Sequence, residues 1–408
     1  MTIQQKMISM QVDIIFNRSE ETTLKEYTML AYDADLELFR DNFKRFMSEN
    51  IAPHYEKWEK EGLMPRSVWS LLGENGYLCV DVPEEYGGYG VPTEYSLMLV
   101  EESARAGYGA LSTAISCHSE IAAPYILHIA SEEQKQHWLP KMVSGEVVGA
   151  IGMTEPGAGS DLQGMRSSAI LNGDHYLLNG SKTFISNGQH ADLVVLAAKT
   201  DPQARAKGVS LLLVDTHLEG FKKGTNLDKI GLHSQDTSEL FFDNVKVPAN
   251  QLLGNPGQGF AYLMQELPRE RTAIAATALG AIRGAIDITT KYVQERQAFG
   301  QKIGSFQNTR FVLAQAKIDE LATAAFYNQN LALYKVSKLD VETAAALKSF
   351  STDMQMKIID SLLQLFGGYG YMTEYPISRF FVDARIQRIY GGTNEIMKEI
   401  VARGIIGR

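Results

Sequence analysis

The sequence predicts an α+β protein in which an N-terminal helical domain precedes a central antiparallel β domain and a C-terminal helical bundle. Three observations support this order. Apolar residues such as Leu36, Phe39 and Phe43 recur at helical spacing in the first third of the chain. Short β-rich runs with Asn-Gly turns follow, and the helical period returns after Pro256. At 408 residues the chain exceeds one ordinary domain, so two or three domains are expected.

Composition indicates a globular protein with a mildly acidic surface. Apolar residues make up 45% and charged residues 21%, which excludes a disordered chain. The 39 Lys and Arg residues against 48 Asp and Glu give a net charge of −9, which argues against a nucleic-acid backbone as the main partner. Two cysteines, Cys79 and Cys117, are too few for a disulfide scaffold and indicate a reducing compartment.

The first segment, residues 1–30, is interpreted as an N-terminal extension with no assigned function. Acidic residues such as Glu20 and Glu26 distinguish it from an Arg-rich transit peptide, and it lacks the apolar core of a secretory signal. No apolar run is expected to reach the length of a membrane span, since Arg283 interrupts Ala273–Ile286. A cytoplasmic location is therefore expected.

Three domains are predicted after this extension. Residues 31–149 form the N-terminal helical domain, and residues 150–255 form the β domain, with expected hairpin turns at Asn172-Gly173 and Asn179-Gly180. Residues 256–408 contain helical segments long enough for a bundle.

Familiar catalytic signatures are absent from the sequence. The Gly-Ala-Gly at positions 157–159 is not a dinucleotide fingerprint, because Leu162 occupies the next required glycine position. No P-loop, HExxH or GxSxG motif occurs, and the eight histidines are scattered singly, so no metal site is expected.

Three glycine-rich loops are the candidates for ligand binding. They are Met153–Asp161 at the entrance to the β domain, Gly367–Tyr371, and Tyr390–Glu395. Small residues let backbone amides approach a flat or phosphorylated ligand closely. Composition alone favours a turn-rich connector for the first loop, whereas two such loops within one helical bundle indicate a bound ligand.

Six short segments become specific when they are taken together. They are Pro83–Gly88, Thr154–Asp161, Phe184–Asn187, Glu295–Gly300, Gln364–Gly368 and Tyr390–Glu395. In this order and at this spacing they resemble the acyl-CoA dehydrogenase family, closest in motif to its long-chain type. The resemblance extends from Asp33 to Arg408 and agrees with the α–β–α order that the texture of the sequence predicts.

The resemblance implies a non-covalently bound FAD and a homotetramer. In the family, the segment matching Ile151–Ser160 lines the flavin ring, and the segment matching Phe184–Ser186 covers its other side. Hydrogen-bond donors at these positions stabilise the negative charge on a flavin that receives hydride. A neighbouring subunit contributes to the adenine end, although a surface ion pair is the alternative explanation for Arg296. The implied cofactor-binding residues are Ile151, Met153, Thr154, Gly159, Ser160, Phe184, Ile185, Ser186, Arg296, Gln307, Gln364, Gly367, Gly368, Thr393, Asn394 and Glu395.

The resemblance also implies where the catalytic base lies. Many members carry a glutamate directly after the tyrosine that matches Tyr390, but this chain has Gly391 there, which cannot accept a proton. The long-chain and isovaleryl types carry the base on a helix, and the matching residue here is Glu270. Pro268 suits a first helical turn, and a solvated first-turn charge is the alternative explanation for Glu270. A base buried beside an apolar substrate should have a pKa raised to roughly 6–7.

Residues around the base are implied to bind the substrate. Arg271 would order the pantetheine arm, Ser160 would bond it, and an amide near Gly391 would bond the thioester oxygen. Arg205 and Lys207 lie on a loop that could meet CoA phosphates, although a solvated loop explains them equally well. The implied substrate-binding residues are Ser160, Pro268, Arg269, Arg271, Gly391 and Gly392.

The activity implied by the resemblance is α,β-dehydrogenation of a saturated acyl-CoA to the trans-2-enoyl-CoA in fatty-acid β-oxidation, with electrons passed to an electron-transferring flavoprotein. A medium- to long-chain substrate is expected first. The alternatives are a short branched acyl-CoA of isovaleryl type, an acyl group on a carrier protein, and an acyl-CoA oxidase that reacts directly with oxygen. A non-enzymatic assembly or nucleic-acid-binding relative is disfavoured by Glu270 and by the net charge of −9.

Overall fold

The computed structural model describes residues 34–407, so the predicted extension at residues 1–30 lies outside the described residues. The chain divides into two compact units, one ending at Asn42 and the other beginning at Phe43. This boundary falls within α3 (Ala34–Phe46). The second unit contains every predicted site residue, because all of them lie between Ile151 and Glu395.

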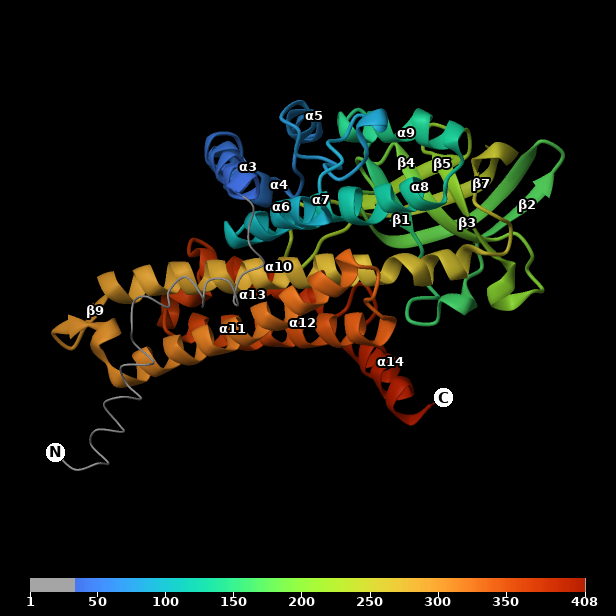
Figure 1. Ribbon diagram of the computed structural model, residues 1–408. Coiled ribbons are helices and arrows are strands. Elements are labelled where there is room, and N and C mark those ends of the chain that lie inside the picture. Colours follow the sequence, from blue (N-terminus) through green and yellow to red (C-terminus); the bar gives the residue numbers. More distant parts are fainter. Residues whose placement is uncertain (1–33, 408) are drawn as a thin grey trace. The chain divides into compact units, whose positions relative to one another are not determined.

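The region that precedes the sheet is helical, as predicted (Figure 1). Helix α6 is central to it, since its residues Ser96–Ala104 are all buried. A π-helical segment, Ser116–Ala122, joins α7 to α8 without a loop, and Ser131 caps α9 through a capping box with Gln134. The helices are α4 (Ala52–Glu61), α5 (Ser67–Glu74), α6 (Thr93–Arg105), α7 (Gly109–Ile115), α8 (Ala123–Ile129) and α9 (Glu132–Val143).

The central domain is one sheet of eight strands, ordered β6-β7-β3-β2-β4-β5-β8, with β1 beside β4. Most neighbouring strands are antiparallel, as predicted, whereas β1 and β2 both run parallel to β4. Residues Leu193–Ala198 of β4 are completely buried, because alternate residues pack into apolar clusters on opposite faces of the sheet. The strands are β1 (Gly149–Gly152), β2 (Ser168–Asn172), β3 (His175–Ser186), β4 (Leu193–Lys199), β5 (Val209–Asp215), β6 (Phe221–Asn226), β7 (Thr237–Pro248) and β8 (Leu252–Leu253).

The two Asn-Gly pairs have different structural roles. The pair at 172–173 turns the chain between β2 and β3, with Gly173 at φ +65°, as predicted. The turn predicted at Asn179-Gly180 is wrong, because Gly180 lies inside β3 at an irregularity in its pairing with β7. Its φ is +138°, and a Cβ there would lie 2.4 Å from Ser167 Oγ. This glycine therefore permits a bulge and a close backbone approach.

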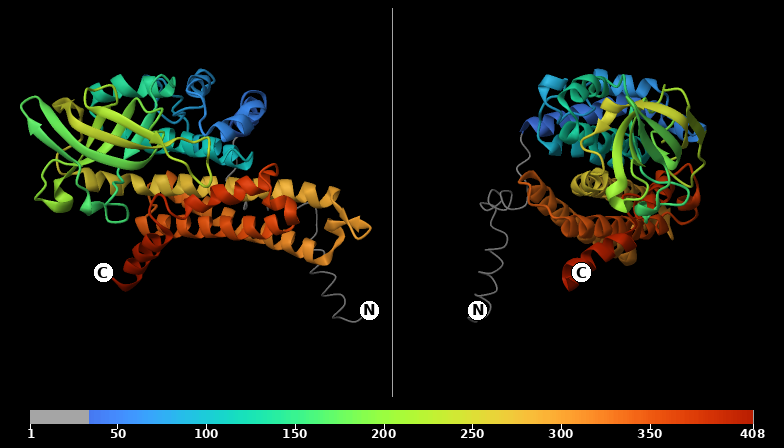
Figure 2. Two further views of the ribbon diagram at one scale, coloured as in Figure 1. Left: turned by 180° about the vertical axis from the view of Figure 1, so that it is seen from behind. Right: turned by 90° about the vertical axis from the view of Figure 1, so that its right-hand side faces the viewer.

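The C-terminal region is a helical bundle organised around α10, which runs between α6 and α12 (Figures 1 and 2). A Cβ at Gly280 or Gly284 would lie 2.1 Å from a backbone carbonyl oxygen of α6, so these glycines allow the two helices to pack closely. A short hairpin of β9 (Gln297–Ala298) and β10 (Gln301–Lys302) joins α10 to α11. The helices are α10 (Gly259–Glu295), α11 (Gln307–Lys335), α12 (Val341–Gln364), α13 (Pro376–Gln387) and α14 (Asn394–Ile406).

Helix α10 differs from the sequence prediction in two respects. Pro268 is not in the first turn, because the helix begins at Gly259, and the proline therefore removes a backbone hydrogen bond in the helix interior. The helix is also long and apolar enough to cross a membrane by length and composition alone, which the sequence analysis did not expect. Of its most apolar stretch 78% is buried inside the protein, as in the core helix of a bundle.

Candidate active site

Glu270 lies on α10 and is 3% exposed. The Tyr125 hydroxyl on α8 donates a 2.8 Å hydrogen bond to its Oε1. The pKa of Glu270 is raised to about 7, mainly by burial and also by the charge of Glu266, whereas the Tyr125 hydrogen bond and Arg271 act to lower it. A carboxyl group with this pKa can take up and release a proton near neutral pH, as a general base must.

Arg271 follows Glu270 and is buried as well. Its Nη1 lies 3.5 Å from the carbonyl oxygen of Val341, and its Nε has no hydrogen-bond partner among the residues that the structure describes. Burial lowers the pKa of Arg271, and the charge of Glu270 opposes this effect. Because an unfilled buried donor is costly, this guanidinium fits the predicted contact with a polar part of a substrate.

Arg269 has a structural role that the sequence analysis did not predict. Its guanidinium is buried between two carboxylates, with Nη2 2.7 Å from Asp81 and 3.0 Å from Glu120. Arg269 therefore joins α10 to the N-terminal helical region through two buried ion pairs, and its predicted contact with substrate stays a prediction. Pro268 precedes it in the helix interior, where its carbonyl accepts a 2.8 Å hydrogen bond from the Thr272 hydroxyl.

The loop around Thr154 is attached to strand β3. The Thr183 amide donates a 2.9 Å hydrogen bond to the Thr154 carbonyl. The Lys182 ammonium, which is fully buried, donates to the Met153 carbonyl at 3.0 Å and to Glu155 Oε1 at 2.8 Å. Two segments that the sequence analysis assigned to a flavin ring are thus held together by an ion pair that it did not identify.

The end of β3 presents an aromatic side chain to solvent. Phe184 is 68% exposed at φ +59°, where the β3–β7 register shifts, while Ile185 beside it is buried and Ser186 is half-buried. On the neighbouring loop, a Cβ at Gly157 or Gly159 would meet nothing within 4 Å. The exposed ring, the hydroxyl groups and this open space fit a flat polar ligand such as a flavin ring.

Cys117 connects the two parts of the site. Its thiol lies 3.7 Å from the Ser186 carbonyl oxygen. Burial raises the pKa of Cys117 to about 12, a backbone hydrogen bond with Ile151 lowers it, and the charge of Glu270 raises it. Cys117 therefore contacts two predicted site residues, Ile151 and Ser186, and is within electrostatic range of a third, Glu270.

The loop at Gly391 lies against α10 close to Glu270. Gly391 has φ +63°, and a Cβ there would lie 2.4 Å from Cδ1 of Ile274, one turn after Glu270. The buried Lys348 ammonium donates to the Gly392 carbonyl at 2.8 Å and to Asn394 Oδ1 at 2.9 Å. Burial lowers the pKa of Lys348 to about 7. This lysine holds the loop in place, and the sequence analysis did not identify it.

The three residues that follow this loop begin α14. The Thr393 side chain caps the helix by accepting a hydrogen bond from the Ile396 amide. Asn394 is buried, and its amide group is engaged within the bundle by Ser349, Thr352 and Asp353, while Glu395 is exposed. Only Glu395 of the three thus presents its side chain fully to solvent.

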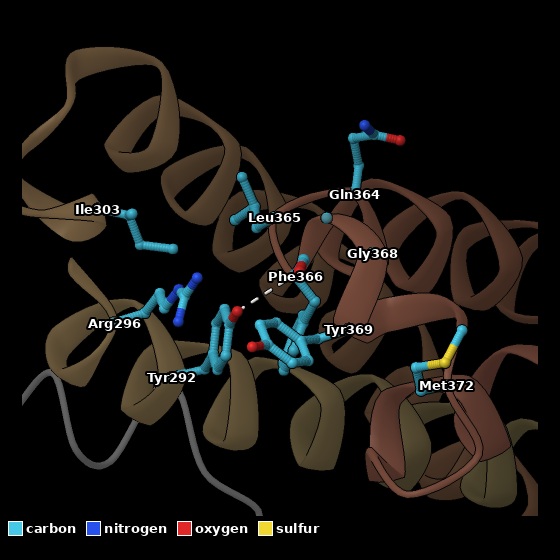
Figure 3. A pocket seen from close by; sticks show the side chains of 10 residues that line it. Tyr292, Arg296, Ile303, Gln364, Leu365, Phe366, Gly368, Tyr369 and Met372 are labelled. Carbon is cyan, nitrogen blue, oxygen red and sulfur yellow. Dashed lines mark hydrogen bonds between the residues drawn. The ribbon is translucent and has the colours of Figure 1, made fainter. Parts of the chain in front are cut away.

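A pocket of about 450 Å³ lies at the other end of α10 (Figure 3). The Arg296 guanidinium lies 5.1 Å from the centre of the Tyr369 ring. This is a cation–π contact, not the surface ion pair that the sequence analysis considered as the alternative. A Cβ at Gly367 or Gly368 would meet nothing within 4 Å, so backbone is accessible to a ligand there. The lining residues are Tyr292, Arg296, Ile303, Gln364, Leu365, Phe366, Gly367, Gly368, Tyr369 and Met372.

The pocket contains four of the residues predicted at the adenine end, namely Arg296, Gln364, Gly367 and Gly368. Gln307, also predicted there, is exposed at the start of α11 and does not line the pocket. Arg205 and Lys207 are exposed on a short turn before β5.

We call Glu266–Ile274 the base end of α10 and Tyr292–Arg296 its pocket end. The 26-residue separation of Glu270 and Arg296 corresponds to about 39 Å of helix.

The chain is similar to known proteins over nearly all of its length. Residues 33–146, 150–245 and 257–406 match the N-terminal, middle and C-terminal domains of acyl-CoA dehydrogenase. The mitochondrial long-chain specific acyl-CoA dehydrogenase of Sus scrofa is 42% identical, over 95% of this chain and 91% of its own length. The crystal structure of an acyl-CoA dehydrogenase from Geobacillus kaustophilus has a TM-score of 0.90 and 44% identity, covering 93% of this chain and 100% of that chain. A glutaryl-CoA dehydrogenase from Mycobacterium smegmatis, solved in complex with FADH2, has a TM-score of 0.86 and 27% identity, covering 92% and 95% of the two chains.

Proposed function

Because the chain belongs to the acyl-CoA dehydrogenase family, we propose that it oxidises a saturated, medium- to long-chain acyl-CoA to the trans-2-enoyl-CoA in fatty-acid β-oxidation. FAD is the proposed cofactor, and an electron-transferring flavoprotein is the proposed acceptor. The observation that carries the proposal is Glu270, a buried carboxyl group with a pKa of about 7. The Cys117 thiol lies 3.7 Å from the carbonyl oxygen of Ser186 on the proposed cofactor side, and the charge of Glu270 acts on its pKa.

We assign Glu270 to removal of the α-proton of the thioester. With a pKa of about 7, roughly half of the molecules carry the carboxylate form at neutral pH. Tyr125 bonds Oε1, so Oε2 is the oxygen that we assign to the proton. The loop of Gly391 and Gly392 lies beside α10, and we assign one of its amides to the thioester oxygen, where a hydrogen bond makes the α-proton more acidic.

The residues around Thr154 and Phe184 are those that would hold the isoalloxazine ring. Phe184 offers an exposed aromatic face, and Thr154 and Ser186 offer hydroxyl groups. When bound, FAD would supply the hydride acceptor for the reaction. The buried pair of Lys182 and Glu155 joins the two segments, which supports a ring site that is already formed in the protein.

A homotetramer is the assembly that we propose, and the distance between the two ends of α10 supports a FAD site that two subunits share. The pocket end lies about 39 Å along α10 from Glu270, further than one extended FAD reaches. Arg296, Gln364 and Gly367 would therefore bind the adenine end of a FAD whose ring lies in a partner subunit. Sizing of the holoenzyme in solution tests this, and a monomer with full FAD content contradicts it.

Substrate class is tested by anaerobic titration with acyl-CoAs of graded length. We expect bleaching of the flavin spectrum to be fastest with medium to long straight chains, in line with the 42% identity to a long-chain specific relative. Faster bleaching by isovaleryl-CoA, or by an acyl group on a carrier protein, would replace the proposed substrate. Peroxide production in air without an added acceptor would replace the proposed acceptor with oxygen.

The base is tested by the Glu270→Gln variant, which keeps the shape of the side chain but removes the proton acceptor. We expect it to retain FAD and acyl-CoA binding but to lose a factor of about 10²–10⁴ in the rate of flavin reduction. Glu133→Gln, at an exposed position on α9, is the matched control and should keep the wild-type rate. Full activity of Glu270→Gln would place the base elsewhere.

A further inference from the structure

Two pairs of side chains face each other between α8 and α10. The Tyr125 hydroxyl donates to Glu270 Oε1 at 2.8 Å, and His128 Nδ1 lies 3.0 Å from Glu266 Oε1. Tyr125 and His128 are three residues apart on α8, and Glu266 and Glu270 are four apart on α10. Residues at these spacings share one face of a helix, so the two pairs form a ladder across the interface.

Tyr125 is suited to be a permanent donor to Glu270. It is completely buried, and burial together with the charge of Glu270 raises its pKa well above the ordinary value for tyrosine. The hydroxyl therefore keeps its proton throughout the pH range in which Glu270 titrates. Its hydrogen bond favours the carboxylate form of Glu270, while burial favours the protonated form.

Glu266 acts on Glu270 in the opposite direction. Its charge, one turn away on α10, raises the pKa of Glu270. Glu266 is buried, whereas 36% of the His128 side chain is exposed, so this pair extends from the interior to the surface. Two further groups interact electrostatically with Glu270: Arg271, whose charge lowers its pKa, and Cys117, whose thiol stays uncharged because burial raises its pKa to about 12.

Building on the proposed role of Glu270, we propose that Tyr125 and Glu266 are positioning residues for the base. Tyr125 fixes Oε1 and so leaves Oε2 to take the α-proton. Glu266, held in place by His128, disfavours the carboxylate that Tyr125 favours, and the two together set the pH at which Glu270 becomes a base. A general base works best when it is ionised yet still binds a proton strongly, which is the balance that two opposing neighbours provide.

The experiment compares Tyr125→Phe with Glu266→Gln in the holoenzyme. The readout is the second-order rate constant of anaerobic flavin reduction by an acyl-CoA between pH 5 and 9, because its pH dependence reports the free enzyme. Tyr125→Phe should move the midpoint to higher pH, and Glu266→Gln should move it to lower pH, each by about one pH unit. The double variant should return close to the wild-type midpoint, since the two changes oppose each other.

Two control variants remove similar contacts whose members are not among the groups that act on the pKa of Glu270. Tyr86→Phe removes the 2.8 Å hydrogen bond from Tyr86 to Glu132, and Asp174→Asn removes the charge 2.9 Å from His175. Both should leave the midpoint unchanged. A second readout needs no turnover. Thermal stability depends on pH through the titration of Glu270, and the pH midpoint of that dependence should move to higher pH in Tyr125→Phe and to lower pH in Glu266→Gln.

The outcomes separate this inference from the proposed base. Unchanged midpoints in Tyr125→Phe and Glu266→Gln, with Glu270→Gln inactive, would overturn the positioning roles and leave Glu270 as the base. Full activity of Glu270→Gln would overturn the base itself. If Tyr125→Phe does not retain FAD, Glu266→Gln tests the proposal by itself. A shift of its pH midpoint to lower pH supports the positioning role, because a residue with only a structural role would not move the midpoint in that direction.

Discussion

The two ends of α10 differ in how far their charged side chains are buried. At the base end, Glu270 is buried, and its partners Tyr125 and Glu266 come from the same chain. At the pocket end, Arg296 is exposed over the Tyr369 ring, and the adjoining glycines leave backbone open. The contrast teaches that a buried carboxyl group is controlled by the side chains packed around it, whereas the pocket end leaves a cation and glycine backbone accessible to a ligand.

The largest expected effect comes from breaking the buried ion pair between Lys182 and Glu155, which holds together the two segments proposed to bind the flavin ring. Lys182→Met leaves Glu155 buried without its cation and should cost about 3–5 kcal/mol of unfolding free energy. Urea unfolding measures the loss. Lys57→Met, which removes an exposed partner of Glu61, is the matched control and should cost less than about 0.5 kcal/mol. Similar losses in the two variants would contradict a special role for the buried pair.

Stability should also reveal the cost of keeping Glu270 buried. Its pKa of about 7 in the folded protein lies above the ordinary value of 4.5, so the folded protein loses stability as the pH rises from 4.5 to 7. Glu270→Gln has no proton to lose. The variant should match the wild type near pH 4 and be more stable by about 3 kcal/mol at pH 8, as urea unfolding at each pH would measure. A difference that does not vary with pH would show that Glu270 does not titrate in this way.

Relocating the carboxylate tests whether the late loop reaches the same α-carbon. In a Glu270→Gly background, Gly391→Glu should restore little activity by itself, because its Cβ would lie 2.4 Å from Ile274 Cδ1. Adding Ile274→Ala should restore about tenfold in flavin reduction. The recovery stays incomplete because φ +63° strains a side chain and a misplaced base is costly. A triple variant as inactive as Glu270→Gly would show that the two positions do not share a geometry.

The smallest expected effect concerns the pocket end. Arg296→Ala should weaken FAD retention about fivefold, as expected for one partly exposed cationic contact. Equilibrium dialysis of FAD measures it, with Lys207→Ala on the turn before β5 as the control. Equal retention in both variants would remove Arg296 from the cofactor site. The pH midpoint of flavin reduction should not change in either variant, because neither residue lies near Glu270.

Local sequence patterns predicted the order of the domains but not each turn. The α–β–α order followed from helical periodicity and from β-rich runs, and the structure confirms it. Gly173 forms the predicted turn, while Gly180, in the same Asn-Gly context, lies inside β3, where it pairs with Phe242 of β7 and leaves room for Ser167. Pro268 was misplaced because the apolar pattern did not reveal that α10 begins at Gly259. Residues 1–30 and the cytoplasmic location remain predictions.

The candidate site was only partly accessible from the sequence. A family motif predicted Glu270 as the base, and glycine at position 391 excluded that position, so the role of Glu270 stays a prediction. Tyr125, Glu266 and Lys348 were missed because their roles depend on packing between elements, as in the 145-residue separation of Tyr125 from Glu270. No local spacing indicates such contacts, and an isolated tyrosine or lysine in a helix is most often ordinary surface or core.

The buried thiol of Cys117 has a practical consequence. A thiol with a pKa of about 12 is almost never a thiolate, so alkylating reagents should modify it only when the protein opens around it. Cys79 is also buried, and burial raises its pKa as well, but it lies in the N-terminal helical region. The unmodified protein therefore contains two buried thiols whose alkylation rates report local opening. The ratio of the two rates shows whether the structure around Cys117 opens separately from the structure around Cys79.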